Sequence, residues 1–320
     1  MIMAKKRIRK PTITQEIMAS VAEKLKKYTH DSTRKQYNRQ MKLYVKFCRE
    51  KYNAKTFDEC RQHVQAYSDF LQSENYSPST IHTYLAAICC TFEINLETIQ
   101  KPIRHVSDYS KGRKNIVPNA NNDLENPKHS HLTEFQKRVG IRRHELKRLR
   151  KNDFTYDESG KFCIVVRRGK GGKKQYQRVL EEDIQFIQTY FDSANPNARV
   201  FDEKLFQNNL NLHKLRAEAA KRYYFEQLKK INENPAYRVQ LEKEIRLRWE
   251  TTNFKKNGKP KQFREEELRG IYYLRGKNRK LAISKGLPVA YDKTALLATS
   301  LFKLSHFRND VTIASYLLAV

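Results

Sequence analysis

Apolar residues recur at intervals of three and four along the first hundred positions, which is the spacing of helices that bury one face. The positions expected to be buried are Ile17, Val21 and Leu25 in a short first helix, Tyr37, Met41, Tyr44 and Cys48 in a long second helix, and Val64, Tyr67 and Leu71 in a third helix from about Asp58 to Ser73. Ser77 followed by Pro78 signals a fourth helix, because Ser can cap a helix and Pro fits its first turn. We therefore predict a four-helix domain over residues 1–104.

The periodic pattern stops after residue 104 and resumes near residue 131. Pro, Asn, Ser, Gly and Lys dominate residues 105–130, which predicts a linker between two domains. Beyond it we expect helices at 132–139, 142–151, 181–191, 213–227, 292–304 and 311–318, with a β-hairpin formed by 162–166 and 176–180. The predicted fold is therefore mainly α with a small β-sheet, and residues 131–320 form an α/β domain.

The charge of the chain predicts its partner. The formal net charge is +29 and the pI is about 9.9. Such a surplus of Lys and Arg favours a polyanionic partner, and double-stranded DNA fits best. An anionic membrane surface is the alternative, but no apolar run reaches the length of a membrane-spanning helix and no signal-peptide core is present, so we expect a cytoplasmic protein without a membrane partner. The five cysteines are odd in number and lack a CxxC pair, which argues against both a disulfide framework and a metal site.

The long second helix carries a basic stripe opposite its apolar one. Its members are Lys35, Arg39, Lys42, Lys46 and Arg49. A helix face that is merely solvated usually mixes basic with acidic residues. We therefore expect this face to contact the DNA backbone, with a solvated face as the alternative.

Four short motifs in the second half contain residue types that suit a phosphodiester. They are Gly-Ile-Arg-Arg-His-Glu-Leu at 140–146, Gly-Lys-Gly-Gly-Lys at 169–173, His-Lys-Leu-Arg at 213–216, and Leu-Ser-His at 304–306 followed by Tyr316. On a helix, the three-residue spacing of His213 and Arg216 puts an imidazole and a guanidinium on one face, where both can bind one anion. Each motif alone is more typical of a solvated basic surface, so their order carries the inference.

In this order the motifs resemble those of the tyrosine recombinase (phage integrase) family. That family shows a Gly-Leu-Arg-x-x-Glu-Leu helix start, a Gly-Lys-Gly hairpin, a His-x-Leu-Arg helix, a Leu-Gly-His helix and a terminal Tyr. The Ser-Pro-Ser-Thr-Ile segment that begins at Ser77 resembles the helix of the family's core-binding domain. The resemblance covers about residues 12–320, and it implies a helical core-binding domain and an α/β catalytic domain that clamp a DNA duplex.

The resemblance also implies how the strand is cut. Tyr316 would attack the phosphorus and form a 3′-phosphotyrosine link, with His213 helping to deprotonate its hydroxyl. Lys170, at the tip of the hairpin, would protonate the leaving 5′-hydroxyl. Glu145 is expected to orient the site rather than react. Because the phosphotyrosine link conserves the bond energy, neither ATP, magnesium nor any other cofactor is expected.

The remaining residues implied by the resemblance bind the phosphate and the DNA. Arg142 and Arg216 would stabilise the negative charge that builds on the non-bridging oxygens at the transition state. His306 would donate to the same oxygens. Arg143, beside Arg142, is expected to be a DNA or surface contact, and Lys173, in the same hairpin turn as Lys170, is expected to contact DNA.

The chain departs from the family pattern at several points. Ser305 stands where the family usually has Gly, and Ala217 replaces the common residue after His-x-Leu-Arg. Tyr316 follows His306 by ten residues, one more than the commonest spacing, which a bulge in the last helix would absorb. The gap after Arg216 is also unusually long. We predict a basic helical insertion at about 217–290 that loops outward and contacts DNA or another protomer.

The function expected from the sequence is site-specific DNA recombination by a homotetramer on DNA, in a bacterial, phage or mobile-element context. A type IB topoisomerase-like enzyme, which would nick and relax DNA as a monomer, is the alternative with the same chemistry. A non-catalytic nucleic-acid-binding protein of the same fold is the alternative of a different class. The complete set of catalytic residue types argues against it.

Overall fold

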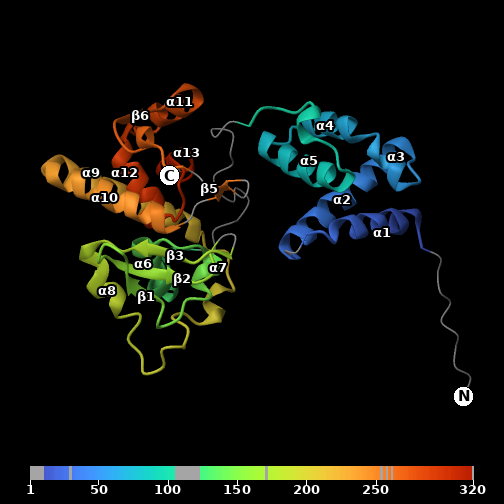
Figure 1. The fold of residues 1–320 in the computed structure, drawn as a ribbon. Coiled ribbons are helices and arrows are strands. Elements are labelled where there is room, and N and C mark those ends of the chain that lie inside the picture. Colours follow the sequence, from blue (N-terminus) through green and yellow to red (C-terminus); the bar gives the residue numbers. More distant parts are fainter. Residues whose placement is uncertain are drawn as a thin grey trace, which may run out of the picture. The chain divides into compact units, whose positions relative to one another are not determined.

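The computed structural model describes residues 11–28, 31–104, 123–169, 172–252 and 262–318, together with the backbone of 255–256 and 259–260. The chain divides into two compact units, Met1–Tyr109 and Ser110–Val320, which are blue to cyan and green to red in Figure 1. Helices predominate, and the strands form small antiparallel sheets, so the predicted fold class is confirmed. Of the expected linker at 105–130, residues 105–122 lie outside the described residues.

The first unit consists of amphipathic helices around one core. They are α1 (Ile13–Leu25), α2 (Asp31–Tyr52), α3 (Phe57–Arg61), α4 (Val64–Ser73) and α5 (Pro78–Phe92), followed by the 3₁₀ turn η1 (Leu96–Thr98). All the predicted apolar stripes pack into this core, with Tyr37 at its margin. The predicted cap of α5 is also confirmed, because the Ser77 hydroxyl accepts a hydrogen bond from the Thr80 backbone N–H at 3.2 Å.

The third predicted helix is in fact two helices. After α3 the backbone N–H groups of Gln62 and His63 bond to carbonyls only three residues back, and this tight turn ends the helix before α4 begins. The apolar spacing hides the break. Cys60 and Val64 are four residues apart and both are buried, so the helical pattern continues across the turn.

The second unit contains a three-stranded antiparallel sheet in the order β1 (Phe154–Tyr156), β2 (Phe162–Val166) and β3 (Gln175–Arg178). Strands β2 and β3 form the predicted hairpin. The short strand β1 was not predicted, because three residues of alternating exposure give little signal. Two smaller sheets pair β4 (Lys255–Lys256) with β5 (Lys259–Pro260), and β6 (Ile271–Tyr273) with β7 (Ala290–Asp292).

The helices of this unit begin with the 3₁₀ turn η3 (Pro127–His129), α6 (Ser130–Val139) and α7 (Arg143–Leu146), and the sheet is followed by η5 (Glu181–Asp183), α8 (Ile184–Gln188) and η6 (Glu203–Phe206). The predicted helices at 142–151 and 181–191 are too long. Beyond α7 the backbone N–H groups of Lys151 and Asn152 bond to the carbonyls of Ala198 and Pro196, which are far along the chain. These bonds replace the ones that would have extended α7.

The C-terminal part is helical. It comprises α9 (Leu212–Glu233), α10 (Pro235–Thr252), η7 (Glu265–Glu267), α11 (Gly276–Ser284), α12 (Lys293–Ala298), the π-helical turn η8 (Thr299–Lys303), α13 (Asn309–Thr312) and the π-helical turn η9 (Ile313–Leu317). Helix α9 joins two cores. Its residues Leu212 and Leu215 pack with α6 and β2, whereas Tyr223 and Tyr224 pack with α10, α12 and the π-helical turns.

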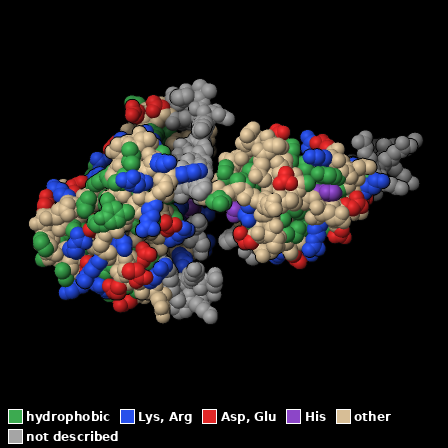
Figure 2. Space-filling model, turned by 90° about the horizontal axis from the view of Figure 1, so that it is seen from above, with side chains coloured by type: hydrophobic (Ala, Val, Ile, Leu, Met, Phe, Trp, Pro, Cys, Tyr) green, Lys and Arg blue, Asp and Glu red, His purple; other side chains and the backbone are tan. Residues whose placement is uncertain are grey.

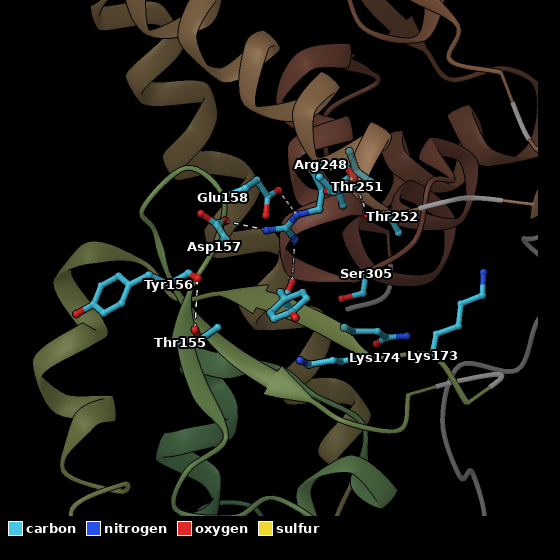
Figure 3. Close-up of a pocket in the computed structure, with 13 residues that line it drawn as sticks. Thr155, Tyr156, Asp157, Glu158, Lys173, Lys174, Arg248, Thr251, Thr252 and Ser305 are labelled. Carbon is cyan, nitrogen blue, oxygen red and sulfur yellow. Dashed lines mark hydrogen bonds and ion pairs between the residues drawn. The ribbon is translucent and has the colours of Figure 1, made fainter.

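The stretch at 217–290 does not loop outward, so that prediction is wrong. Leu241, Ile245 and Trp249 of α10 belong to the same core as α12 and the last helices. Arg248 of α10 also forms ion pairs with Asp157 and Glu158, which follow β1, and Figure 3 shows these pairs. The stretch is therefore part of the body of the second unit.

A matched pair of substitutions in α10 tests this conclusion. Ile245 is fully buried, and Ile245→Ala should lower the free energy of unfolding by about 2–5 kcal/mol because it leaves a cavity. Leu247, two residues away, is 40% exposed, and Leu247→Ala should cost under about 1 kcal/mol. Urea unfolding of both variants gives the comparison. Equal, small losses would indicate that α10 is not part of the core.

Candidate active site

The described motif residues come together where the two cores of the second unit meet. The turn after α6 carries Arg142, the first turns of α9 carry His213 and Arg216, the residues after η8 carry His306, and η9 carries Tyr316. A small cluster of Ala217, Ala220, Leu304 and Tyr316 fills the space between these elements. Segments that are far apart in sequence therefore meet at one place.

Arg216 lies at the centre of this site. Its side chain has no exposed surface, and its guanidinium donates to the carbonyl oxygens of Gly140 and Leu304, the second at 3.2 Å. Its Nε donates to the hydroxyl oxygen of Tyr316 at 3.4 Å. Among the described residues no carboxylate forms an ion pair with it. A buried cation that is bonded only to neutral groups favours an anion beside it.

Arg142 adds a second guanidinium that is partly open to solvent. Its Nη1 donates to a carboxylate oxygen of Glu145 at 2.8 Å, and its backbone N–H donates to the other oxygen at 2.7 Å. The Glu145 side chain is fully buried, so it fixes the position of Arg142 rather than facing solvent. The role of Glu145 in orienting a reactive site stays a prediction.

The pKa values of both histidines are lowered in the folded protein. Burial, followed by the positive charges of Arg216 and Arg142, lowers the pKa of His306 to about 3. The pKa of His213 is lowered in the same direction by burial and by the neighbouring guanidiniums of Arg216 and Arg142, and because this residue is exposed we give the guanidiniums more weight than burial as the cause. Both ring nitrogens of His306 are buried and have no partner among the described residues. These two ring nitrogens are therefore free to bond a ligand or a water molecule that enters the site.

Tyr316 is held among these groups by an irregular helix. Its ring centroid lies 5.5 Å from that of His213 and 6.2 Å from that of His306, and the Arg216 guanidinium lies 5.6 Å from it. The π-helical turn η9 accommodates one extra residue, as expected from the longer spacing between His306 and Tyr316. No hydrogen bond joins His213 to the Tyr316 hydroxyl in this structure.

The backbone shows why glycine would suit position 305. Ser305 has φ +54°, in the left-handed region that glycine adopts without strain. Gly140, whose carbonyl accepts from Arg216, has φ +69°, and an added Cβ would lie 2.8 Å from the Cβ of Ala219. The sequence contains glycine at position 140 and lacks it at position 305.

The other predicted site residues have different surroundings. Lys170 lies outside the described residues. Lys173 is exposed and lines a pocket of about 550 Å³ between β1, β3 and the end of α10, which Ser305 also borders (Figure 3). The Arg143 guanidinium donates to backbone carbonyls of the segment before α9, including that of Leu210, so it holds that segment in place.

The basic stripe of α2 belongs to the first unit. Lys35, Arg39, Lys42 and Lys46 are exposed, whereas Arg49 is half-buried and donates to the Thr14 hydroxyl at 2.6 Å. Lys35 pairs with Asp31, and Lys46 pairs with Glu50. On the face in Figure 2, Lys and Arg are interspersed with Asp and Glu. Contact of this stripe with DNA stays a prediction.

Comparisons with known proteins add little to this geometry. No protein-family model and no curated protein matches the chain. Among solved structures, XerA recombinase is similar over 65% of this chain and 84% of its own, at 19% identity and a TM-score of 0.22. We base no assignment on a likeness of that size. In the described residues, no three metal-binding side chains gather and no helix could cross a membrane.

Replacing Ser305 with Gly should stabilise the protein. Gly removes the strain of a positive φ and a buried hydroxyl that has no partner among the described residues, so we expect a gain of about 0.5–1 kcal/mol in the free energy of unfolding. Ser305→Ala removes only the hydroxyl and serves as the control. Urea unfolding measures both. A Gly variant no more stable than the Ala variant would show that the backbone is not strained.

The low pKa of His306 predicts a pH-dependent contribution to stability. Below the ordinary His pKa of about 6.5, the unfolded chain binds a proton that the folded chain takes up only near pH 3. His306 therefore costs stability progressively as the pH falls from 6.5. We expect the urea midpoint of the wild type to fall relative to that of His306→Asn between pH 7.5 and pH 4.5. A constant difference would contradict the lowered pKa.

Proposed function

We propose that this chain cuts and rejoins DNA strands with Tyr316 as the nucleophile. The observation that supports the proposal most strongly is the buried guanidinium of Arg216, which donates to the Tyr316 hydroxyl and has no carboxylate partner among the described residues. The unpaired imidazole of His306 lies beside them. A phosphodiester would supply both the negative charge and the acceptor atoms that these groups need.

The reaction that fits these groups has two steps. In the first, the Tyr316 oxygen attacks the phosphorus, the bond to the 5′-oxygen breaks, and a 3′-phosphotyrosine link forms. The lowered pKa of His213 favours the neutral imidazole, which would take up the phenol proton, and its ring centroid lies 5.5 Å from that of Tyr316. In the second step a 5′-hydroxyl attacks the phosphorus, and Tyr316 leaves with its proton restored.

Two guanidiniums and one imidazole would stabilise the transition state. Arg216 is fixed by two carbonyls, and Arg142 is fixed by Glu145, so neither needs to reorganise when charge builds on the phosphoryl oxygens. A neutral His306 can donate one ring N–H to the same oxygens. In this proposal Arg142, Arg216 and His306 would together stabilise the charge on the phosphoryl oxygens.

The rest of the assignment follows from the same proposal. Lys170 would protonate the leaving 5′-oxygen, while Lys173, Arg143 and the basic stripe of α2 would contact the DNA backbone. For recombination, four protomers would bind two DNA duplexes together and exchange strands between them. Strand exchange between two labelled duplexes separates recombination from relaxation of a single duplex.

The nucleophile is tested by removing one hydroxyl. The protein is incubated with an end-labelled, singly nicked DNA pool of random sequence, and covalent adducts are separated on a denaturing gel. Tyr316→Phe should abolish the adducts and leave filter binding of DNA unchanged, because only the attacking oxygen is lost. Tyr273→Phe, which changes a 65% exposed tyrosine, should form adducts as the wild type does.

Two outcomes would count against the assignment. Adducts that persist in Tyr316→Phe would mean that another residue attacks the phosphorus. Binding without adducts in the wild type would favour a non-catalytic nucleic-acid-binding protein.

A further inference from the structure

A buried lysine lies three residues before His306 and has no role in the reaction described above. Lys303, the last residue of η8, is 1% exposed. Its Nζ donates to the carbonyl oxygens of Arg138 and Arg178, the second at 3.2 Å, and lies 5.8 Å from the ring centroid of Tyr223. Among the described residues no carboxylate forms an ion pair with it.

Lys303 therefore cross-links the end of η8 both to the end of α6 and to β3, and the first two of these segments also hold Arg216. Arg138 lies two residues before Gly140, and Lys303 lies one residue before Leu304; Gly140 and Leu304 supply the two carbonyls that fix the Arg216 guanidinium. His306 follows three residues after Lys303. A shift between the end of α6 and the end of η8 would therefore move Arg216 and His306 together.

An ammonium in this position is costly for stability. Burying a charge among neutral acceptors is unfavourable, and an unbranched apolar side chain such as Met would fill the same space without that cost. The charged or titratable side chains that influence Lys303 are Asp183, Arg222, Arg216 and Cys163. Burial is the main cause that lowers the pKa of Lys303 to about 7. Arg222 and Arg216 lower this pKa further, and Asp183 and Cys163 offset the lowering only in part.

We propose that Lys303 is a positioning residue for the phosphate site, and that its protonated form holds the end of α6 and the end of η8 at the spacing that Arg216 and His306 need. The inference rests on the proposed function. When Lys303 loses its proton, the charge that strengthens both hydrogen bonds is lost and the cross-link weakens. Anion binding should then depend on pH through a residue that never touches the anion.

The test uses an anion whose charge is constant over the pH range. Sodium sulfate is titrated at fixed ionic strength, and binding is followed by the fluorescence of Trp249, the single tryptophan of the chain. The Trp249 ring lies 3.9 Å from that of Phe307, which is next to His306, so its emission should report on the site. Wild type, Lys303→Met and Lys161→Met are compared at pH 6 and pH 8.5.

Lys303→Met should weaken sulfate binding about tenfold at pH 6, where the wild-type lysine is charged, as expected when a binding group is displaced. At pH 8.5 the two proteins should bind sulfate almost equally. Lys161→Met, which removes a partly exposed lysine paired with Glu181, should match the wild type at both values. Equal binding by Lys303→Met and wild type at pH 6, or the same ratio at both pH values, would overturn the proposal.

The thermal stability of Lys303→Met gives an independent test. The substitution should raise the Tm at pH 6, whereas it should weaken sulfate binding at that pH. The folded chain loses the Lys303 proton near pH 7 and the unfolded chain only near the ordinary Lys pKa of about 10.4, so the unfolded state binds more protons between these values. The charge therefore costs most stability below pH 7. Lys303→Met should have the higher Tm at pH 6, by a margin that shrinks toward pH 9. A lower Tm for the variant at pH 6 would overturn the proposal.

A third variant separates this inference from the proposed function. Arg142→Ala should weaken sulfate binding at both pH values, because Arg142 faces the anion directly. If Arg142→Ala binds sulfate normally, the phosphate site itself is misplaced and the proposed function fails. If Arg142→Ala is defective and Lys303→Met is not, only the role of Lys303 fails. Absence of sulfate binding in the wild type would overturn both.

Discussion

The hydrogen bonds of the buried Arg216 guanidinium are the interaction on which the site depends. A guanidinium removed from water costs several kcal/mol unless its N–H groups are bonded. Here two of its donors go to the carbonyls of Gly140 and Leu304, which come from opposite ends of the second unit, and a third goes to Tyr316. The hydrogen bonds that offset the cost of burying the guanidinium therefore also bring the motif segments together. They leave its positive charge available to bind an anion.

Irregular backbone keeps these segments in register. The π-helical turn η8 precedes His306, and the π-helical turn η9 contains Tyr316. Each turn accommodates an extra residue, which rotates the side chains that follow it around the helix axis. Ser305 adopts a left-handed conformation between them. Helix α10 supports this region from outside, because the Arg248 guanidinium lies 5.1 Å from the Phe302 ring of η8 while pairing with the carboxylates after β1. The long stretch between the second and third motifs thus has a structural role.

The features of the site that could be predicted from the sequence are those that depend on side-chain identity and spacing. Paired spacing placed His213 and Arg216 on one helix face, and the extra residue before Tyr316 predicted the bulge that η9 contains. Backbone acceptors have no signature, so the carbonyls that fix Arg216 could not be predicted. Nor could the burial of Lys303 be predicted, because a lysine in an apolar helix usually extends its ammonium to solvent. The outward insertion was mispredicted because its charge surplus, 21 Lys and Arg against 10 Asp and Glu over 217–303, outweighed its buried positions such as Ile245.

The most direct test of the account is the chemical identity of the residue that becomes joined to DNA. Protein trapped on nicked DNA is digested with nuclease and protease, and the peptides are analysed by mass spectrometry for a remaining nucleotide. The account predicts a nucleotide attached through its 3′-phosphate to the hydroxyl of Tyr316. A nucleotide on any other residue, or a 5′-phosphate linkage, would contradict the arrangement of Arg142, Arg216, His306 and Tyr316 as a catalytic site.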